Sequence, residues 1–224
     1  MPNWCFNTVT IEGNAEDIKR VKAQLNKPFS HPSRDWKTDE ITIVNYDNPV
    51  FAFWNIVSPP EEMYGLYHEV NGSKKDPVTG EMVRTGDTNW NWYNFNNREW
   101  GTKWDVAISN TEDPSERLVS ESDTKLVYMF DTAWSPPIGA LNALSLQYPR
   151  LSITNEWEEE QGFGATTVHK DGDDEEVSGY DWKCQSGHMY CGDVSNIWDE
   201  DLQETVCPTC VSNSVGINVS GRNQ

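Results

Sequence analysis

Two passages of this chain have the order strand, helix, strand, and together they restrict its fold more than any other feature. Residues 7–44 begin with the alternating, β-branched run Asn7–Ile11, and Asn14 can cap the helix that follows. Residues 126–157 repeat this order around the helix opener Ser135-Pro-Pro. Two such units predict an α+β protein with a ferredoxin-like split β-α-β core, in which helices cover one face of the sheet.

The segment between these passages predicts several further elements. We expect a polar loop over residues 28–40 and a strand over Val50–Val57, which is rich in β-branched and aromatic residues. Ser58 is followed by two prolines and a glutamate, the pattern of a helix start with a capping box. A helix near residues 90–99 and a strand at Val106–Ile108 complete the expected order.

Four residues near the end of the chain have the spacing of a metal site. Cys207 and Cys210 flank a Pro-Thr turn, which places two thiolates on one side of a tight knuckle. Zinc requires four such ligands in a tetrahedron, and a second pair about 20 residues upstream matches zinc-ribbon spacing. Cys184 belongs to that pair, and its partner is either His188 or Cys191, of which the tighter local spacing favours His188. We therefore expect one structural zinc ion.

The composition changes near residues 162–179, which are rich in glycine and acidic side chains. This change predicts two units, a ferredoxin-like domain over residues 1–165 and an acidic, zinc-ribbon-like module over residues 166–224. A segment this polar cannot bury much apolar area, so we expect the metal to fold the module.

The charge balance restricts the class of partner. The chain has 36 Asp and Glu residues against 17 Lys and Arg residues, which gives a net charge of -19. This excess argues against binding to duplex nucleic acid or to an anionic membrane, and it favours a protein partner with a basic surface. No apolar run approaches the ~18 residues of a membrane span, and five cysteines suit a reducing compartment, so we expect a cytoplasmic protein.

Residues 155–204 hold 15 Asp and Glu residues against two Lys residues, and therefore most of the excess charge. One interpretation is a solvated face that keeps the protein soluble. The other is a partner-binding surface that imitates the spacing of phosphates, with a tryptophan as its anchor. The residues predicted for that surface are Trp157, Glu158, Glu159, Glu160, Asp173, Asp174, Glu175 and Glu176.

The tryptophan-rich stretch 90–104 has two interpretations. It could form a base-stacking platform, as aromatic residues do in ferredoxin-like RNA binders. Its only cations are Arg98 and Lys103, however, which favours a helix packed on the sheet. Cys5, between Trp4 and Phe6, predicts a buried structural thiol.

Several motifs resemble the YubB-type ferredoxin-like family of phage and plasmid accessory proteins. They are Met1-Pro-Asn-Trp-Cys-x-Asn, Trp100–Trp104, Phe130–Pro137 and the acidic run Glu156–Glu160, and the resemblance extends over about residues 1–170. It implies a ferredoxin-like fold and carriage on a mobile element. It implies no catalytic residue.

These observations predict a non-enzymatic accessory protein that binds a host protein through an acidic, tryptophan-bearing surface. Such a protein could inhibit a defence or nucleic-acid-processing system by imitating nucleic acid. One alternative is a single-strand nucleic-acid-binding protein that uses the open face of the sheet. Another is a hydrolytic metalloenzyme, which would need a metal with an open coordination position.

Overall fold

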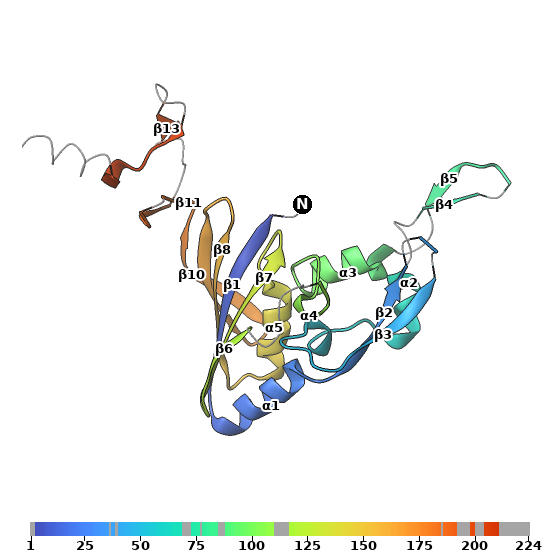
Figure 1. The fold of residues 1–224 in the computed structure, drawn as a ribbon, viewed down its shortest axis with the longest axis horizontal. Coiled ribbons are helices and arrows are strands. Elements are labelled where there is room, and N and C mark those ends of the chain that lie inside the picture. Colours follow the sequence, from blue (N-terminus) through green and yellow to red (C-terminus); the bar gives the residue numbers. More distant parts are fainter. Residues whose placement is uncertain are drawn as a thin grey trace, which may run out of the picture.

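The chain is built around one six-stranded antiparallel sheet (Figure 1). The computed structural model describes residues 3–35, 37–38, 40–68, 73–76, 78–84, 88–109, 117–184, 186–191, 198–199 and 204–210. The strand order is β10-β9-β8-β1-β7-β6. The strands are β1 (Trp4–Glu12), β6 (Leu118–Glu121), β7 (Lys125–Ala133), β8 (Ser152–Glu159), β9 (Gly164–Lys170) and β10 (Asp173–Tyr180).

The central part of the sheet has the predicted split β-α-β arrangement. Helix α1 (Ala15–Leu25) follows β1, and helix α5 (Ile138–Gln147) connects β7 to β8. Strand β1 lies between β7 and β8 and is antiparallel to both. The two units are therefore interleaved in one sheet, as in a ferredoxin-like fold. Strands β9 and β10 extend this sheet beyond β8.

The strand that completes the first unit is not the expected one. Residues 41–44 lie in β3 (Ile41–Tyr46), which pairs with β2 (Phe29–Arg34) in a separate two-stranded sheet. Strand β6 takes the place beside β7, so residues 29–109 are an insertion between α1 and β6. The predicted loop over residues 28–40 thus contains β2, whose polar sequence has none of the alternation by which strands are recognised.

Two predicted strands are short helices instead. Residues 50–57 contain the 3₁₀-helix η1 (Phe53–Asn55), and Val106–Ile108 lies in helix α4 (Val106–Ser109). Both begin at the buried carboxylate of Asp105, which accepts hydrogen bonds from the amides of Trp54 at 2.7 Å and Ala107 at 2.8 Å. Since Asp105 is 51 residues from Trp54, no local pattern could predict this contact.

The other elements of the insertion are short. The helix expected from Ser58 starts later, with Pro60 before η2 (Glu61–Met63) and α2 (Tyr64–Tyr67). Strands β4 (Ser73–Lys75) and β5 (Met82–Arg84) form a hairpin. The helix expected near residues 90–99 is confirmed, and its elements are η3 (Thr88–Trp90) and α3 (Trp92–Glu99).

Helices α1 and α5 pack on one face of the sheet with the insertion beside them, and the core lies between these layers (Figure 1). Trp100 is fully buried there and donates a hydrogen bond from Nε1 to the carbonyl of Val57 at 2.8 Å. The core interpretation of the tryptophan-rich stretch is confirmed for this residue. Cys5 is also fully buried, and burial raises the pKa of its thiol to about 12, as expected for a structural cysteine.

The sheet does not end at the boundary expected after residue 165. That position lies within β9, which pairs with β8 on one side and β10 on the other. The sheet therefore includes residues up to Tyr180, and the acidic composition of β10 concealed its role as an edge strand. No helix among the described residues is long and apolar enough to span a membrane.

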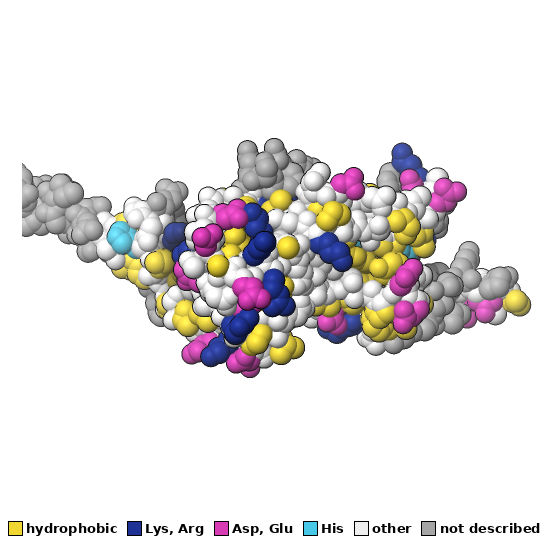
Figure 2. Space-filling model, turned by 90° about the horizontal axis from the view of Figure 1, so that it is seen from below, with side chains coloured by type: hydrophobic (Ala, Val, Ile, Leu, Met, Phe, Trp, Pro, Cys, Tyr) yellow, Lys and Arg dark blue, Asp and Glu magenta, His cyan; other side chains and the backbone are white. Residues whose placement is uncertain are grey.

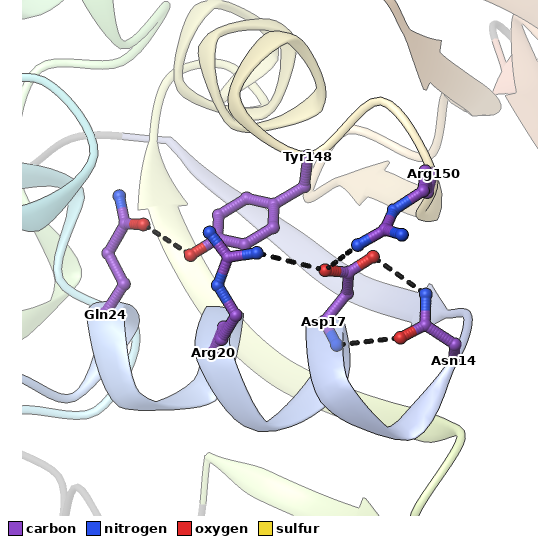
Figure 3. A network of polar contacts seen from close by, with 6 residues as sticks. All are labelled: Asn14, Asp17, Arg20, Gln24, Tyr148 and Arg150. Carbon is purple, nitrogen blue, oxygen red and sulfur yellow. Dashed lines mark hydrogen bonds and ion pairs between the residues drawn. The ribbon is translucent and has the colours of Figure 1, made fainter.

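Helix α1 is tied to the end of α5 and the residues after it by a polar network (Figure 3). Asn14 caps the helix by accepting a hydrogen bond from the amide of Asp17 at 3.0 Å, and its Nδ2 donates to Asp17 Oδ2 at 2.8 Å. Arg150 donates from Nη2 to Asp17 Oδ1 at 2.8 Å. Tyr148 donates from Oη to Gln24 Oε1 at 2.7 Å. The cap thus joins elements that are far apart in the sequence.

Acid should weaken the fold partly through Asp17. The hydrogen bond from Asn14 is the largest influence on this carboxyl, and with Arg150 it holds the pKa below 3.8 despite burial. A carboxyl with a lowered pKa stabilises the folded state above its unfolded pKa, and the contribution is lost as the pH falls through the folded value. Asp17→Asn should therefore flatten the fall in melting temperature as the pH decreases below about 4. Glu16→Gln, exposed on the same turn, is the control for thermal melts measured across this range.

Candidate metal centre and binding groove

The first half of the metal centre lies in a tight hairpin. Strands β11 (Trp182–Lys183) and β12 (Met189–Tyr190) flank a turn in which the amide of Cys184 donates to the carbonyl of His188 at 3.0 Å. Gly187 has φ +82, a conformation that side-chain-bearing residues rarely adopt. The glycine thus allows the turn that places Cys184 and His188 on the same side of the hairpin.

The second half is the Cys-x-x-Cys knuckle, which follows strands β13 (Trp198–Asp199) and β14 (Glu204–Thr205). The amide of Cys210 donates to Cys207 Sγ at 3.3 Å. Tyr190, on β12, places its hydroxyl 3.0 Å from Cys207 Sγ and 2.8 Å from the hydroxyl of Thr209. Tyr190 therefore links the knuckle to the hairpin, a role that its position in the sequence did not reveal.

Cys184, His188, Cys207 and Cys210 converge with the dimensions of a tetrahedral site. Their ligand atoms all lie within 4.8 Å of one another. His188 Nδ1 is 3.4 Å from Cys184 Sγ, 3.5 Å from Cys207 Sγ and 3.4 Å from Cys210 Sγ. The Sγ atoms of Cys184 and Cys210 are 3.9 Å apart. Around a tetrahedral zinc ion, these separations would be about 3.6 Å for nitrogen to sulfur and about 3.8 Å for sulfur to sulfur.

The group is thus positioned to bind a metal ion. Its histidine is His188, as the tighter spacing predicted. Cys191, the alternative ligand, lies outside the group, and its exposed thiol donates to the carbonyl of Gly179 at 2.7 Å.

The surroundings of the group favour the metal-binding thiolate of Cys207, whereas at His188 they favour the protonated imidazole, which must lose its proton when a metal binds. Hydrogen bonds with Cys184 and then Cys207 raise the pKa of His188. Burial acts to raise the pKa of Cys207, but hydrogen bonds with the Tyr190 hydroxyl and the Cys210 amide outweigh it and lower the pKa to about 6. A thiolate is the form that binds a metal ion, so this environment prepares Cys207 as a ligand.

A groove of about 500 Å³ crosses the face of the sheet opposite α1 and α5. One row of cross-strand neighbours runs through five strands of the sheet. Phe6 pairs with Asp131 and with Glu158, and Gly164 pairs with Glu158 and with Tyr180. A Cβ atom at residue 164 would lie 2.8 Å from Tyr180 Oη. Glycine here leaves room for Tyr180 to donate a hydrogen bond to Glu158 Oε2 at 2.6 Å.

A second row completes the floor of the groove. Its residues, in strand order, are Met129, Thr8, Glu156, Thr166 and Ser178. Phe6 and Met129 are 48% and 52% exposed, and Glu156 is exposed as well. Lys183 and Met189 of the C-terminal hairpin also line the groove, and Lys183 forms an ion pair with Glu158. The floor therefore combines half-exposed apolar side chains with carboxylates.

The structure separates the acidic residues predicted for a partner surface. Side chains alternate between the two faces of a strand, and paired residues share a face. Trp157 pairs with Asn7 and Glu159 pairs with Cys5, so both point toward the helices. Glu159 is only 3% exposed, which corrects its assignment to an exposed surface. Glu158 lies on the groove side.

The acidic residues of β10 are divided in the same way. Asp174 pairs with His169 and Glu176 with Thr167 on the helix-covered side, and Asp174 Oδ1 accepts a hydrogen bond from Asn142 on α5 at 2.7 Å. Asp173 and Glu175 occupy the alternate positions. Glu160, just after β8, accepts a hydrogen bond from the amide of Trp4 at 3.1 Å. The eight predicted residues therefore do not form one surface.

Sequence reasoning missed the groove, although one signal was present. The buried residues of β1 alternate along the strand and are Cys5, Asn7, Val9 and Ile11. Phe6 lies between two of them and is therefore on the opposite face of the strand. An aromatic residue on the face of a strand that is expected to face water indicates an interaction surface.

A family model and a solved structure are similar to parts of this chain. Residues 103–201 match the family model described as the ferredoxin-like domain in Api92-like protein, a range that includes Cys184 and His188 and ends before Cys207. The crystal structure of protein Api92 from Yersinia pseudotuberculosis is similar to this chain with a TM-score of 0.43 and 10% sequence identity. The similarity covers 82% of this chain and 99% of that one. A search of curated proteins finds no match.

Proposed function

We propose that this chain is a non-enzymatic binding protein that docks a basic protein partner in the groove on the open face of its sheet. The observation that carries the proposal is the combination of half-exposed apolar side chains and carboxylates in one concave site. Apolar anchors supply binding energy once water is excluded, and surrounding charges select the partner.

The charge of the groove favours a basic partner. Asp131, Glu156 and Glu158 line it, and Lys183 is the one cation among its described residues. That cation is already paired with Glu158. An acidic cleft attracts Lys and Arg side chains and repels phosphate groups. This balance supports a protein partner over the single-stranded nucleic acid that remains the alternative.

Several cations on another side of the molecule are paired with acids. Figure 2 shows basic and acidic side chains interspersed on the side where α1 lies. Lys22 pairs with Glu121 at 2.6 Å, and Lys125 pairs with Glu12 at 3.1 Å. The groove, with its excess of carboxylates, therefore differs in charge pattern from this side.

The metal centre supports a structural role for its ion, which we propose is zinc. Three sulfur ligands and one imidazole suit zinc, and four protein ligands fill every position of a tetrahedron. A metal held in this way has no open position for water or substrate, which argues against the hydrolytic alternative. The ion would instead hold the hairpin that carries Lys183 and Met189 at the edge of the groove.

The biological setting is part of the same proposal. The resemblance to YubB-type proteins supports carriage by a phage or plasmid, where a partner would be a protein of the host cytoplasm. A small acidic protein could then inhibit a defence or nucleic-acid-processing system by occupying its basic surface.

The groove proposal predicts a loss of partner binding in the double variant Phe6→Ser, Glu156→Gln. Loss of an apolar anchor and a groove charge should weaken binding about tenfold or more and slow association at low salt. Partners are captured from host-cell lysate with the wild-type protein, purified, and measured by surface plasmon resonance at two salt concentrations. The matched control is Val78→Ser, Glu81→Gln, which makes the same kinds of change on the β4–β5 hairpin, where Val78 is 91% exposed.

Two results would contradict the proposal. One is a captured partner that binds the groove variant and the control variant equally well. The other is tight binding of a single-stranded oligonucleotide that weakens steeply with salt, because this result would favour the nucleic-acid alternative.

A further inference from the structure

Strand β3 lies at the edge of the small sheet in the insertion, beside β2 and apart from the six-stranded sheet (Figure 1). Among the described residues, no hydrogen bond joins the backbone of β3 to an element other than β2. An edge strand directs alternate amides and carbonyls outward, where they can pair with a further strand. The six residues of β3 therefore present a row of available backbone groups about 20 Å long.

The side chains of β3 also suit a further strand. The sequence Ile-Thr-Ile-Val-Asn-Tyr has no charged residue and is rich in β-branched residues, which favour strands. Ile41 and Ile43 are 49% and 59% exposed, and Val44 is exposed as well. Ile41 and Ile43 lie on one face of the strand, because side chains alternate between faces. A neighbouring strand would cover part of this aliphatic surface.

The other edge strands of the described chain have features that oppose pairing. Strand β10 has four consecutive acids, Asp173–Glu176, followed by a bulge. Strand β6 is four residues long, ends in Glu121 and is also irregular. Strand β2 contains Pro32, which has no amide, and the backbone of this residue is hydrogen-bonded by His68. Charges, bulges, prolines and short strands are the usual protection of an edge, and β3 has none of them.

The charge of the chain favours a second copy as the strand that pairs with β3. With a net charge of -19, two copies repel each other across most of their surfaces. The uncharged strand is a place where they can approach, since the nearest acids in the sequence, Glu40 and Asp47, lie beyond its ends. A basic partner would meet no carboxylate within β3. Antiparallel pairing of a strand with its own copy is self-complementary, because a two-fold axis relates the two sides.

We propose that two copies of this chain associate by antiparallel pairing of β3 with β3, which forms a continuous four-stranded sheet. This association goes beyond the binding of a partner in the groove and does not depend on it, because no residue of β3 lines the groove. Stable interfaces use about 20–30 residues from each side, and a strand of six residues supplies far fewer. The expected dimer is therefore reversible, with a dissociation constant in the micromolar range.

The test is sedimentation equilibrium of the full-length protein over a range of concentrations. Wild type should dimerise, and more tightly in about 0.5 M salt than in about 0.05 M salt, because salt screens the repulsion between acidic chains. Ile43→Glu should weaken the dimer about tenfold or more, since it adds like charges to the paired strands. Ile41→Glu should act in the same way. The matched control is Val119→Glu, which makes a similar change at a half-exposed residue of the edge strand β6.

Hydrogen exchange then tests the strand pairing itself. Exchange of the amides in residues 41–46 should slow as the concentration of wild-type protein rises, because pairing protects the amides that point outward. The same residues in Ile43→Glu should show little change over this range. Both isoleucines are exposed, so the variants should stay folded, as circular dichroism would check.

Several results would overturn the proposal. One is a wild-type protein that stays monomeric at millimolar concentration. Another is a dimer that Ile43→Glu and Val119→Glu weaken equally, or one that forms without slower exchange in residues 41–46. A dimer that weakens with salt would indicate ion pairs between other surfaces. A monomeric wild type that captures a host protein, with capture lost in Ile43→Glu, would assign the open edge to a strand of that protein.

Discussion

Replacing Cys207 with Ser should abolish metal binding and unfold the C-terminal hairpin and knuckle. Cys207 belongs to the group of four residues positioned to bind a metal ion, and its Sγ contacts Tyr190 of the hairpin. Structural zinc sites contribute about 10–16 kcal/mol of binding energy. The binding energy lost with one ligand should therefore exceed the small packing energy of a segment this polar. Elemental analysis of protein purified without chelator should find one zinc ion per wild-type chain and none in the variant.

The matched control for this experiment is Cys191→Ser. Cys191 is an exposed cysteine in the same region but lies outside the ligand group. Its variant should keep one zinc ion and the same hydrogen-exchange protection at residues 182–190. Zinc that is retained in Cys207→Ser, or lost equally in both variants, would contradict the assigned ligands. Wild-type protein that carries a different metal would contradict zinc while leaving the ligand set in place.

Trp100→Ala should have the largest effect on the stability of the sheet and its helices. The indole is fully buried, packs near Phe53 and Phe95, and donates to the carbonyl of Val57. Truncation of a buried tryptophan costs about 3–5 kcal/mol, because it leaves a cavity, and here it also leaves a carbonyl without its donor. Since domains are stable by about 5–15 kcal/mol, the variant should lose a large fraction of its free energy of unfolding.

Urea denaturation followed by circular dichroism measures this loss. The control is Trp134→Ala, where the same substitution removes a side chain that is 44% exposed. That control should lower the free energy of unfolding by much less than Trp100→Ala. Equal losses in the two variants would mean that Trp100 does not occupy the core as described.

Features encoded within a few residues were predictable from the sequence. Asn14 was recognised as a cap because a helix start needs a side-chain acceptor at that position, and β1 was recognised by its alternation. The metal ligands were predicted because each half of the group is a local turn of fixed spacing. In each case the chemistry of a short segment restricts its conformation, whatever the remainder of the chain does.

Pairings between distant segments were not predictable in this way. Strand β3, which was expected to complete the first unit, pairs with β2 in a separate sheet, and β6 lies beside β7 in its place. Val50–Val57 has a strand-forming sequence, yet it contains the 3₁₀-helix η1, in which the Trp54 amide donates to the buried carboxylate of Asp105, 51 residues away. At this place a long-range contact outweighed local propensity. Val106–Ile108 is helical as well, and there the same carboxylate accepts a hydrogen bond from the nearby amide of Ala107.

The sequence by itself therefore determined the α+β class, the ferredoxin-like core, the buried thiol of Cys5 and the four residues of the metal centre. Only the tertiary structure decided that the acidic run of β8 is divided between two faces, since the register of a strand decides which side chains share a surface. It also decided that β3 lies at an open edge, because β2 alone pairs with it among the described strands. Local spacing determines which groups a turn can bring together, whereas strand register and core packing determine which groups meet across the molecule.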